Sequence, residues 1–247
     1  MALREEMERT GNWLFRWRSY LPLALVLPTL AAMHHPDYLN QNRGGNDVWA
    51  LVCLTVSLVG LAIRVITVGH VPRGTSGRNT REGQVAEVLN TTGMYSLVRH
   101  PLYLGNYVIW LGISMFCGIW WLIVIFALAF WLYYERIMFA EEEFLRRKFG
   151  EAYLAWADAT PAFFPRWSGW RPPALPFSLR TVLRREYPGL FAICASFFAL
   201  EAYQRVVIQG DWRPNPLWTG IFLGGLVVFV SLRFLKRNTM FLAVEGR

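Results

Sequence analysis

The segment Gly93–Gly105 gathers side chains that could bind a polar ligand at the start of a helix. It reads Gly-Met-Tyr-Ser-Leu-Val-Arg-His-Pro-Leu-Tyr-Leu-Gly. Pro101 suits the first turn of a helix, where no backbone N–H is needed, and the free N–H groups and dipole of that turn favour an anion. Arg99, His100 and the tyrosines beside them add donors and aromatic faces, and Gly105 would let a backbone or ligand come close. Singly, each could be an ordinary interfacial side chain of a membrane helix. Together they predict a binding site.

A second group of ionisable residues follows the next apolar stretch. Glu135 and Arg136 stand at its end, where charges in a membrane are costly unless they are paired or used. Arg136 could hold an anionic ligand through bidentate hydrogen bonds, and Glu135 could receive a proton from an amine. Glu141–Glu143 come next, and a solvated helix start would also explain these three carboxylates.

The elements that must position these residues are membrane-spanning helices. Hydrophobic residues make up 54% of the 247 residues, and the mean hydropathy is +0.27. Several stretches carry no charge, and about 20 apolar residues suffice to cross a hydrocarbon core. We expect an all-α bundle of about six spans, with a tight hairpin near Gly118, at residues 19–35, 47–69, 101–117, 119–138, 187–209 and 216–235. A signal peptide is the alternative for the first of these, because Arg16 and Arg18 precede it.

Positive charge marks alternate connectors. Of the 25 Lys and Arg residues, 21 lie before the first span, between the second and third, from the last turn of the fourth to the fifth, or from the last turn of the sixth onward. By the positive-inside rule these segments face the cytoplasm. We therefore expect an integral membrane protein with both termini cytoplasmic, in the inner membrane if the source is a bacterium. The net charge of +8 then reflects topology and attraction to anionic lipids, without a nucleic-acid partner.

The two long connectors on this side differ in character. Residues 70–99 are polar and rich in Gly, Thr and Asn, as in a flexible loop. In Glu141–Ala159, apolar residues recur at helical spacing, which predicts an amphipathic helix that closes the site: Phe144, Leu145, Phe149, Tyr153 and Trp156. Prolines then break regular structure. We expect a core domain at 1–175 and a C-terminal helix pair at 176–247. The three cysteines lie in apolar stretches and predict buried side chains, with no metal site.

Two motifs in this order resemble a known superfamily. Arg-His-Pro-x-Tyr-x-Gly at residues 99–105 is followed, about forty residues on, by Glu-Glu-x-x-Leu-x-x-x-Phe-Gly-x-x-Tyr at 141–153. The arrangement is similar to that of the isoprenylcysteine carboxyl methyltransferases and phospholipid methyltransferases, over about residues 84–165. These are membrane-embedded enzymes that use S-adenosylmethionine. The resemblance implies that the cofactor is bound by Gln84, Val88, Leu89, Tyr95, His100, Pro101, Leu102, Tyr103 and Glu141. It also implies an acceptor-binding arginine one helical turn before the glutamate, and Arg136 lies one residue beyond that position.

The resemblance and the residues together predict methyl transfer from S-adenosyl-L-methionine to a lipid-like acceptor at the cytoplasmic membrane face. A phosphorylated or carboxylated lipid ranks first as the acceptor, an aminolipid second and a prenylcysteine third. A membrane sterol-type reductase that binds NADPH is the alternative enzyme, because such reductases resemble this family in their helical arrangement. A transporter or scaffold would also explain the spans, but it predicts no nucleotide binding.

Overall fold

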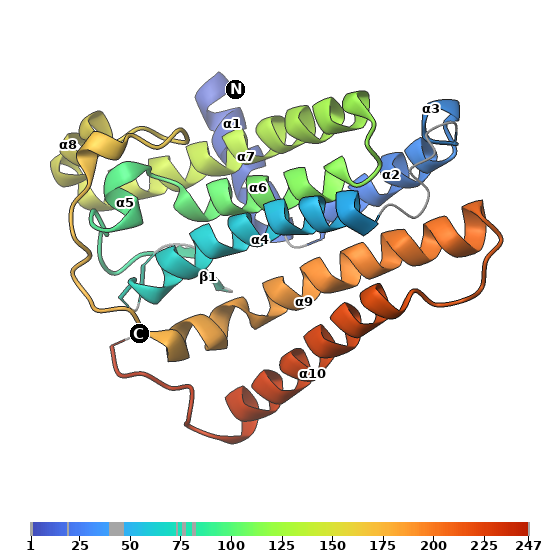
Figure 1. Ribbon diagram of the computed structural model, residues 1–247. Coiled ribbons are helices and arrows are strands. Elements are labelled where there is room, and N and C mark those ends of the chain that lie inside the picture. The colour runs from blue at the N-terminus through green and yellow to red at the C-terminus, as the bar shows by residue number, and fades with distance from the viewer. Residues whose placement is uncertain are drawn as a thin grey trace.

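The computed structural model describes residues 2–18, 20–39, 47–72, 74–75, 78–80 and 83–246, and most of these are helical. Its long helices lie side by side in the predicted bundle (Figure 1): α4 (Asp47–Gly69), α6 (Pro101–Met115), α7 (Trp120–Phe149), α9 (Leu179–Tyr203) and α10 (Pro216–Asn238). The shorter elements are α1 (Leu3–Trp17), a 3-10 turn (Leu21–Leu25), α2 (Val26–Met33), α3 (Pro36–Leu39), β1 (Arg78–Thr80), β2 (Gly83–Val85), α5 (Met94–Leu97), α8 (Glu151–Ala159), a second 3-10 turn (Trp167–Gly169) and a π-turn (Gln204–Ile208).

Helix α4 packs against both α6 and α9, while α10 packs on α9 and α7 on α6. Glycines permit the closest of these approaches. A Cβ atom on Gly60 would lie 2.6 Å from the carbonyl oxygen of Gly105, and one on Gly105 would lie 2.5 Å from Cγ of Arg64. Small residues let helix backbones meet in this way inside a membrane. The motif glycine Gly105 therefore serves helix packing, and the close backbone approach expected there is confirmed.

A polar network inside the bundle joins α4 to three other helices. Arg64 donates through Nε and Nη2 to the two carboxylate oxygens of Glu186 on α9, at 2.8 and 2.9 Å. Its Nη1 donates to Oδ1 of Asn106 on α6 at 2.7 Å, and Asn106 Nδ2 donates to the Tyr134 hydroxyl on α7 at 3.0 Å. Ionisable groups persist inside a membrane protein when they are paired in this way. Helix α9 is thus joined to the rest of the bundle by hydrogen bonds. The domain boundary expected after residue 175 stays a prediction.

Within the described residues, four helical segments are long and apolar enough to cross a membrane: Asp47–Gly69, Trp120–Phe149, Leu179–Ile208 and Pro216–Asn238. The two other predicted spans are shorter in the structure. Helix α6 has 15 residues. The stretch 19–35 is divided into the 3-10 turn and α2, and the short α3 follows it. Pro22 lies in the first turn of the 3-10 piece, and Pro36 is the first residue of α3. A proline interrupts a preceding helix because it has no N–H group to donate.

Two boundaries differ from the prediction. Helix α7 does not end near residue 138 but continues to Phe149, so the amphipathic helix expected over 141–159 is not one element. Its first half extends α7 and its second half is α8, because Gly150 interrupts the helix with φ of +53°. The connector 70–99 contains an antiparallel hairpin of β1 and β2 and the short helix α5, where a loop was expected. The predicted hairpin of α6 and α7 is confirmed, with Gly118 at φ +64°.

A buried cluster of side chains lies at the end of the bundle that contains α8. We call this end of the bundle the α8 end. The members of the cluster come from the connector after α4, from the C-terminal turns of α7 and from α8: Val71, Ala86, Tyr95, Leu145, Tyr153 and Trp156. In Figure 1, α5, α8 and the β1 hairpin gather at the same end. Segments that are distant in the sequence therefore meet where the first motif begins.

Candidate functional site

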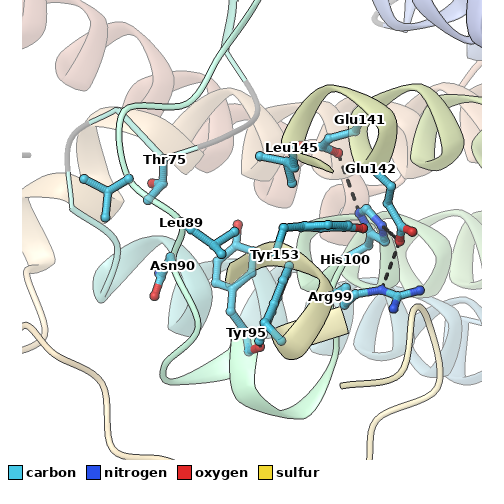
Figure 2. Close-up of a pocket in the computed structure, with 12 residues that line it drawn as sticks. Thr75, Leu89, Asn90, Tyr95, Arg99, His100, Glu141, Glu142, Leu145 and Tyr153 are labelled. Carbon is cyan, nitrogen blue, oxygen red and sulfur yellow. Dashed lines mark hydrogen bonds and ion pairs between the residues drawn. The ribbon is translucent and has the colours of Figure 1, made fainter. Parts of the chain in front are cut away.

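Two adjoining cavities open at the α8 end of the bundle. The larger has a volume of about 380 Å³, counting the space open to solvent, and Figure 2 shows its lining: Thr75, Val88, Leu89, Asn90, Tyr95, Arg99, His100, Glu141, Glu142, Leu145, Tyr153 and Trp156. The second, of about 260 Å³, shares four of these residues and adds Pro101, Leu102 and Tyr103. The two cavities therefore form one site, built from the first motif, the end of α7 and α8.

The polar centre of the site is His100 between two carboxylates. Its Nε2 lies 2.9 Å from Oε1 of Glu142, and its Nδ1 lies 3.6 Å from Oε2 of Glu141. Arg99 places Nε 3.0 Å from the same Oε1 of Glu142 and donates through Nη1 to the Ala157 carbonyl at 2.8 Å. Figure 2 shows these side chains converging from α7 and from the segment before α6. Two cations and two anions thus share one largely buried position.

Burial and charge act in opposite directions on His100. Its side chain is only 5% exposed, and burial by itself lowers the pKa of the imidazole; the interactions with Glu141 and Glu142 outweigh it, so the pKa lies above the ordinary value of 6.5. The protonated imidazolium can donate to both carboxylates at once. On α8, burial followed by the charge of Glu142 raises the pKa of Tyr153, so its hydroxyl keeps its proton.

The backbone before α6 is fixed by a later segment of the chain. The N–H groups of Arg99 and His100 donate to the carbonyl oxygens of Pro161 and Ala162, at 2.9 and 3.2 Å. These two N–H groups precede the first turn of α6, and the expectation that the free N–H groups of that turn favour an anion stays a prediction. Pro101 then starts α6, as expected. The side chains of this segment, more than its amides, therefore face a ligand.

The other half of the larger cavity is apolar and aromatic. Val88 and Leu89 come from the connector, Leu145 from α7 and Trp156 from α8. The indole Nε1 of Trp156 donates to the carbonyl of Tyr95 at 3.0 Å, which fixes the ring against α5. The arrangement can hold a molecule with a flat apolar part at one end and cationic or hydroxyl groups at the other.

The structure brings together eight of the nine residues predicted to bind the cofactor. Val88, Leu89, Tyr95, His100 and Glu141 line the larger cavity, and Pro101, Leu102 and Tyr103 line the smaller one. The ninth, Gln84, pairs with Asn79 through its backbone in the β hairpin. Its side chain lies outside the described residues.

The two residues predicted to act on the acceptor lie elsewhere. Arg136 donates through Nη1 to the Thr10 hydroxyl of α1 at 3.1 Å, and Glu135 is exposed. Neither lines the described part of the two cavities. Seven residues that line the larger cavity were not among the predicted cofactor ligands: Thr75, Asn90, Arg99, Glu142, Leu145, Tyr153 and Trp156. Four of these stand in the two motifs, so their side chains could have been proposed from the same pattern.

Known proteins match the part of the chain that builds this site. Residues 49–152 match the phospholipid methyltransferase family. The nickel-cobalt-cadmium resistance protein NccN of Alcaligenes xylosoxydans xylosoxydans is 39% identical over 129 residues, which are 51% of this chain and 56% of that protein. The cobalt-zinc-cadmium resistance protein CzcN of Cupriavidus metallidurans is 40% identical over 89 residues, covering 36% and 41% of the two chains. The protein-S-isoprenylcysteine O-methyltransferase of Schizosaccharomyces pombe is 32% identical over 78 residues, covering 32% and 33%.

The chain thus spans about half the length of these relatives or less. No solved structure matches it. Two relatives are named for metal resistance, and among the described residues no group of three His, Cys, Asp or Glu side chains is placed to hold a metal ion. The family match contains α4, α6, α7 and both residues of the His100–Glu141 pair. Over residues 49–152, this integral membrane protein is similar to the superfamily of phospholipid and isoprenylcysteine methyltransferases.

Proposed function

We propose that this protein transfers a methyl group from S-adenosyl-L-methionine to a lipid-like acceptor at the cytoplasmic face of the membrane. One observation carries the proposal. Eight residues that the superfamily resemblance implies for the cofactor come from separate segments of the chain and line two adjoining cavities. A transporter or scaffold would not require these particular side chains to converge.

The lining fits the chemistry of the cofactor. Val88, Leu89 and Leu145 offer an apolar wall to an adenine ring, and the carboxylates of Glu141 and Glu142 can accept from an ammonium group or ribose hydroxyls. Tyr153 is buried beside Glu142, and its hydroxyl makes no hydrogen bond of good geometry among the described residues. A buried hydroxyl of this kind usually finds a partner, and a bound ligand would provide one.

The bound cofactor supplies an electrophilic methyl group on its sulfonium. The protein has to hold it, exclude water and orient the acceptor. Because Glu141 and Glu142 are held by His100 and Arg99, their oxygens are fixed before the ligand arrives. Glu141 lines both cavities, and in place of Glu135 it becomes our candidate for receiving a proton from an amine acceptor. An ionised oxygen acceptor needs no base.

The acceptor we favour is a phosphorylated or carboxylated lipid, followed by an aminolipid and then a prenylcysteine. Arg99 is the guanidinium that lines both cavities among the described residues, whereas Arg136 faces α1. Arg99 therefore replaces Arg136 as our candidate for holding an anionic group. Glu142 neutralises part of the charge of Arg99. An anionic acceptor would therefore share the N–H donors of Arg99 with Glu142.

Binding and turnover test the proposal separately. Purified protein in detergent should bind labelled S-adenosylmethionine and not NADPH, which is the cofactor of the reductase alternative. Glu141→Gln should weaken S-adenosylmethionine binding about tenfold to a hundredfold, because a hydrogen bond to a charged group contributes roughly 1.5–3 kcal/mol. The exposed Glu151→Gln on α8 is the matched control and should bind normally.

Methyl transfer is then measured with methyl-labelled S-adenosylmethionine and a total membrane lipid extract, by mass spectrometry of the lipids. We expect label in a lipid that gains the mass of one methyl group. Binding of NADPH in place of S-adenosylmethionine would refute the proposed function. Cofactor binding without any labelled lipid would refute the acceptor class.

A further inference from the structure

A third cavity lies next to the proposed cofactor site. It is an open groove of about 1,020 Å³ between α8, α5 and residues 160–171. The groove shares one lining residue, Trp156, with the larger cofactor cavity. Because that indole is hydrogen-bonded to the Tyr95 carbonyl, it forms a fixed wall between the two spaces. A molecule in the groove therefore does not occupy the cofactor site.

The charged residues of this groove differ in kind from those of the cofactor site. Arg166 and Arg171 line it, together with the hydroxyl-bearing residues Thr91, Thr160 and Ser168, and with Ser96, whose hydroxyl already donates to the Gly93 carbonyl. No carboxylate belongs to its described lining, whereas Glu141 and Glu142 line the cofactor cavity. Arg166 is positioned by a hydrogen bond from Nη2 to the Ala159 carbonyl. Guanidinium and hydroxyl donors with no carboxylate in the described lining suit a phosphate group.

The segment that carries both arginines also presents aromatic rings at its surface. Phe164, Trp167 and Trp170 are 74%, 76% and 50% exposed. Their neighbour Phe163 turns inward and packs edge-on against Trp131 of α7, with the ring centroids 5.7 Å apart. Helix α7 is one of the candidate membrane spans. Exposed aromatic and arginine side chains beside a span are typical of the membrane interface, where phosphate groups are those of lipids.

Residues 160–171, which we call the strap, also hold the first motif. The carbonyls of Pro161 and Ala162 accept from the N–H groups of Arg99 and His100, and the carbonyl of Arg171 accepts from the N–H of Gly93 at 3.0 Å. Both ends of the segment 93–100 are therefore bonded to the strap. A ligand that fixes the strap would also fix the residues that line the cofactor cavity.

We propose that this groove binds the phosphate head group of an anionic phospholipid of the surrounding leaflet, and that the bound lipid steadies the strap over the cofactor site. The first part stands on the groove alone. The second part rests on the proposed function, because it predicts that anionic lipid increases the affinity for S-adenosylmethionine.

Lipid retention tests the first part. The protein is placed in nanodiscs of equal parts phosphatidylcholine and phosphatidylglycerol, released, and examined by native mass spectrometry for lipid that stays bound. Arg166→Gln with Arg171→Gln should retain phosphatidylglycerol about tenfold less than the unchanged protein, because hydrogen bonds to a charged group are lost. Arg237→Gln, an exposed arginine at the same end on α10, is the control and should retain it normally. Equal retention by the double variant would overturn the site, and displacement of the lipid by millimolar inorganic phosphate would show that the ligand is free phosphate.

Cofactor affinity tests the second part. The dissociation constant of S-adenosylmethionine is measured in nanodiscs of phosphatidylcholine alone and in the mixed nanodiscs. The unchanged protein should bind it several-fold more tightly in the mixed discs, and the double variant should show no difference. Loss of lipid retention with unaltered lipid dependence of the cofactor affinity would overturn the coupling. Absence of S-adenosylmethionine binding in both discs would refute the proposed function and leave the result on lipid retention standing.

Discussion

His100 contacts both carboxylates of the site, and its protonation state decides how they are held. As an imidazolium it can donate from both ring nitrogens, to Glu142 at 2.9 Å and toward Glu141 at 3.6 Å. A neutral imidazole has one N–H and can satisfy only one of them. The charge on this ring therefore couples the arrangement of the site to pH.

The first prediction follows from the raised pKa of His100. A raised pKa in the folded state means that the charged imidazolium stabilises the fold fully below the unfolded pKa of about 6.5. This contribution is lost as the pH rises through the higher, folded pKa. The unchanged protein should therefore exceed His100→Asn in melting temperature by more at pH 6 than at pH 9, measured by intrinsic fluorescence in detergent. A difference that is the same at both pH values would contradict it.

The second prediction compares two arginines. Lysine keeps the charge of arginine but lacks the planar fork that contacts two acceptors. Arg99 contacts Glu142 and the Ala157 carbonyl within the site, so Arg99→Lys should lower methyl transfer at least about tenfold, as expected for a lost charged hydrogen bond. Arg136 contacts Thr10 on α1, so Arg136→Lys should methylate lipid at nearly the normal rate. If the effects are reversed, the acceptor site lies on the α1 side of α7.

Eight residues predicted for the cofactor line the two cavities, whereas the two residues predicted for the acceptor do not. His100 and Glu141 belong to motifs whose order fixes their identity. The choice of Arg136 relied on its closeness in sequence to Glu141, but five residues turn a helix by roughly 140°. That rotation directs Arg136 to α1, a contact that no local pattern reveals.

At the level of elements, the contact of α4 with α6 depends on the absence of side chains at two glycines. A Cβ atom at position 105 would lie 2.5 Å from Arg64 Cγ and 2.8 Å from the Gly60 carbonyl oxygen. The two helices cannot separate freely, because Arg64 of α4 also forms hydrogen bonds with Asn106 of α6 and Glu186 of α9. The start of α6, which carries His100, is thus held at a fixed distance from α4.

The third prediction is that Gly105→Ala destabilises the protein. Overpacking of this kind costs about 1–3 kcal/mol, and the melting temperature in detergent should fall accordingly. Gly220→Ala is the matched control on α10, because nothing lies within 4 Å of the added methyl group. Alanine is the better helix former by up to about 1 kcal/mol, so the control should melt at the same temperature or higher. Equal melting temperatures for Gly105→Ala and the unchanged protein would contradict the close packing.

The helices themselves were largely predictable, and their ends were less so. The charge-free stretches marked α4, α9 and α10 because a membrane span needs an apolar run of a certain length. The continuation of α7 to Phe149 was missed because charged residues after position 138 suggested a new element at the surface. The break falls at Gly150, whose positive φ ends α7. Near the N-terminus, an apolar run with prolines gave short helices where a single span was expected.

The whole molecule has two unlike ends. Both α5 and α8, with the proposed cofactor site, lie at one end, and the turn between α9 and α10 lies at the other (Figure 1). Most positive charge in the sequence belongs to the connectors of the first end. By the positive-inside rule we predict that the α8 end faces the cytoplasm.

The fourth prediction concerns this orientation. Reporter fusions after Arg81 and Arg166 should report the cytoplasm, and a fusion after Trp212 should report the outside, because α9 lies between the last two sites. Alkaline phosphatase and green fluorescent protein serve as opposite reporters, each active on one side only. The same reporter active at both Arg166 and Trp212 would contradict the span assigned to α9.

The ion pair of Arg64 with Glu186 has a consequence for how these two positions evolve. Arg64 lies within the region that matches the superfamily, whereas Glu186 lies beyond it on α9. Removal of one partner of a buried ion pair leaves a charge that costs roughly 3–5 kcal/mol, which is a large part of the stability of most proteins. A lineage can therefore hardly exchange the two residues one at a time. Among descendants of a common ancestor, we expect Arg64 and Glu186 to be kept together or replaced together, and chains without a helix corresponding to α9 to carry an uncharged residue at the position of Arg64.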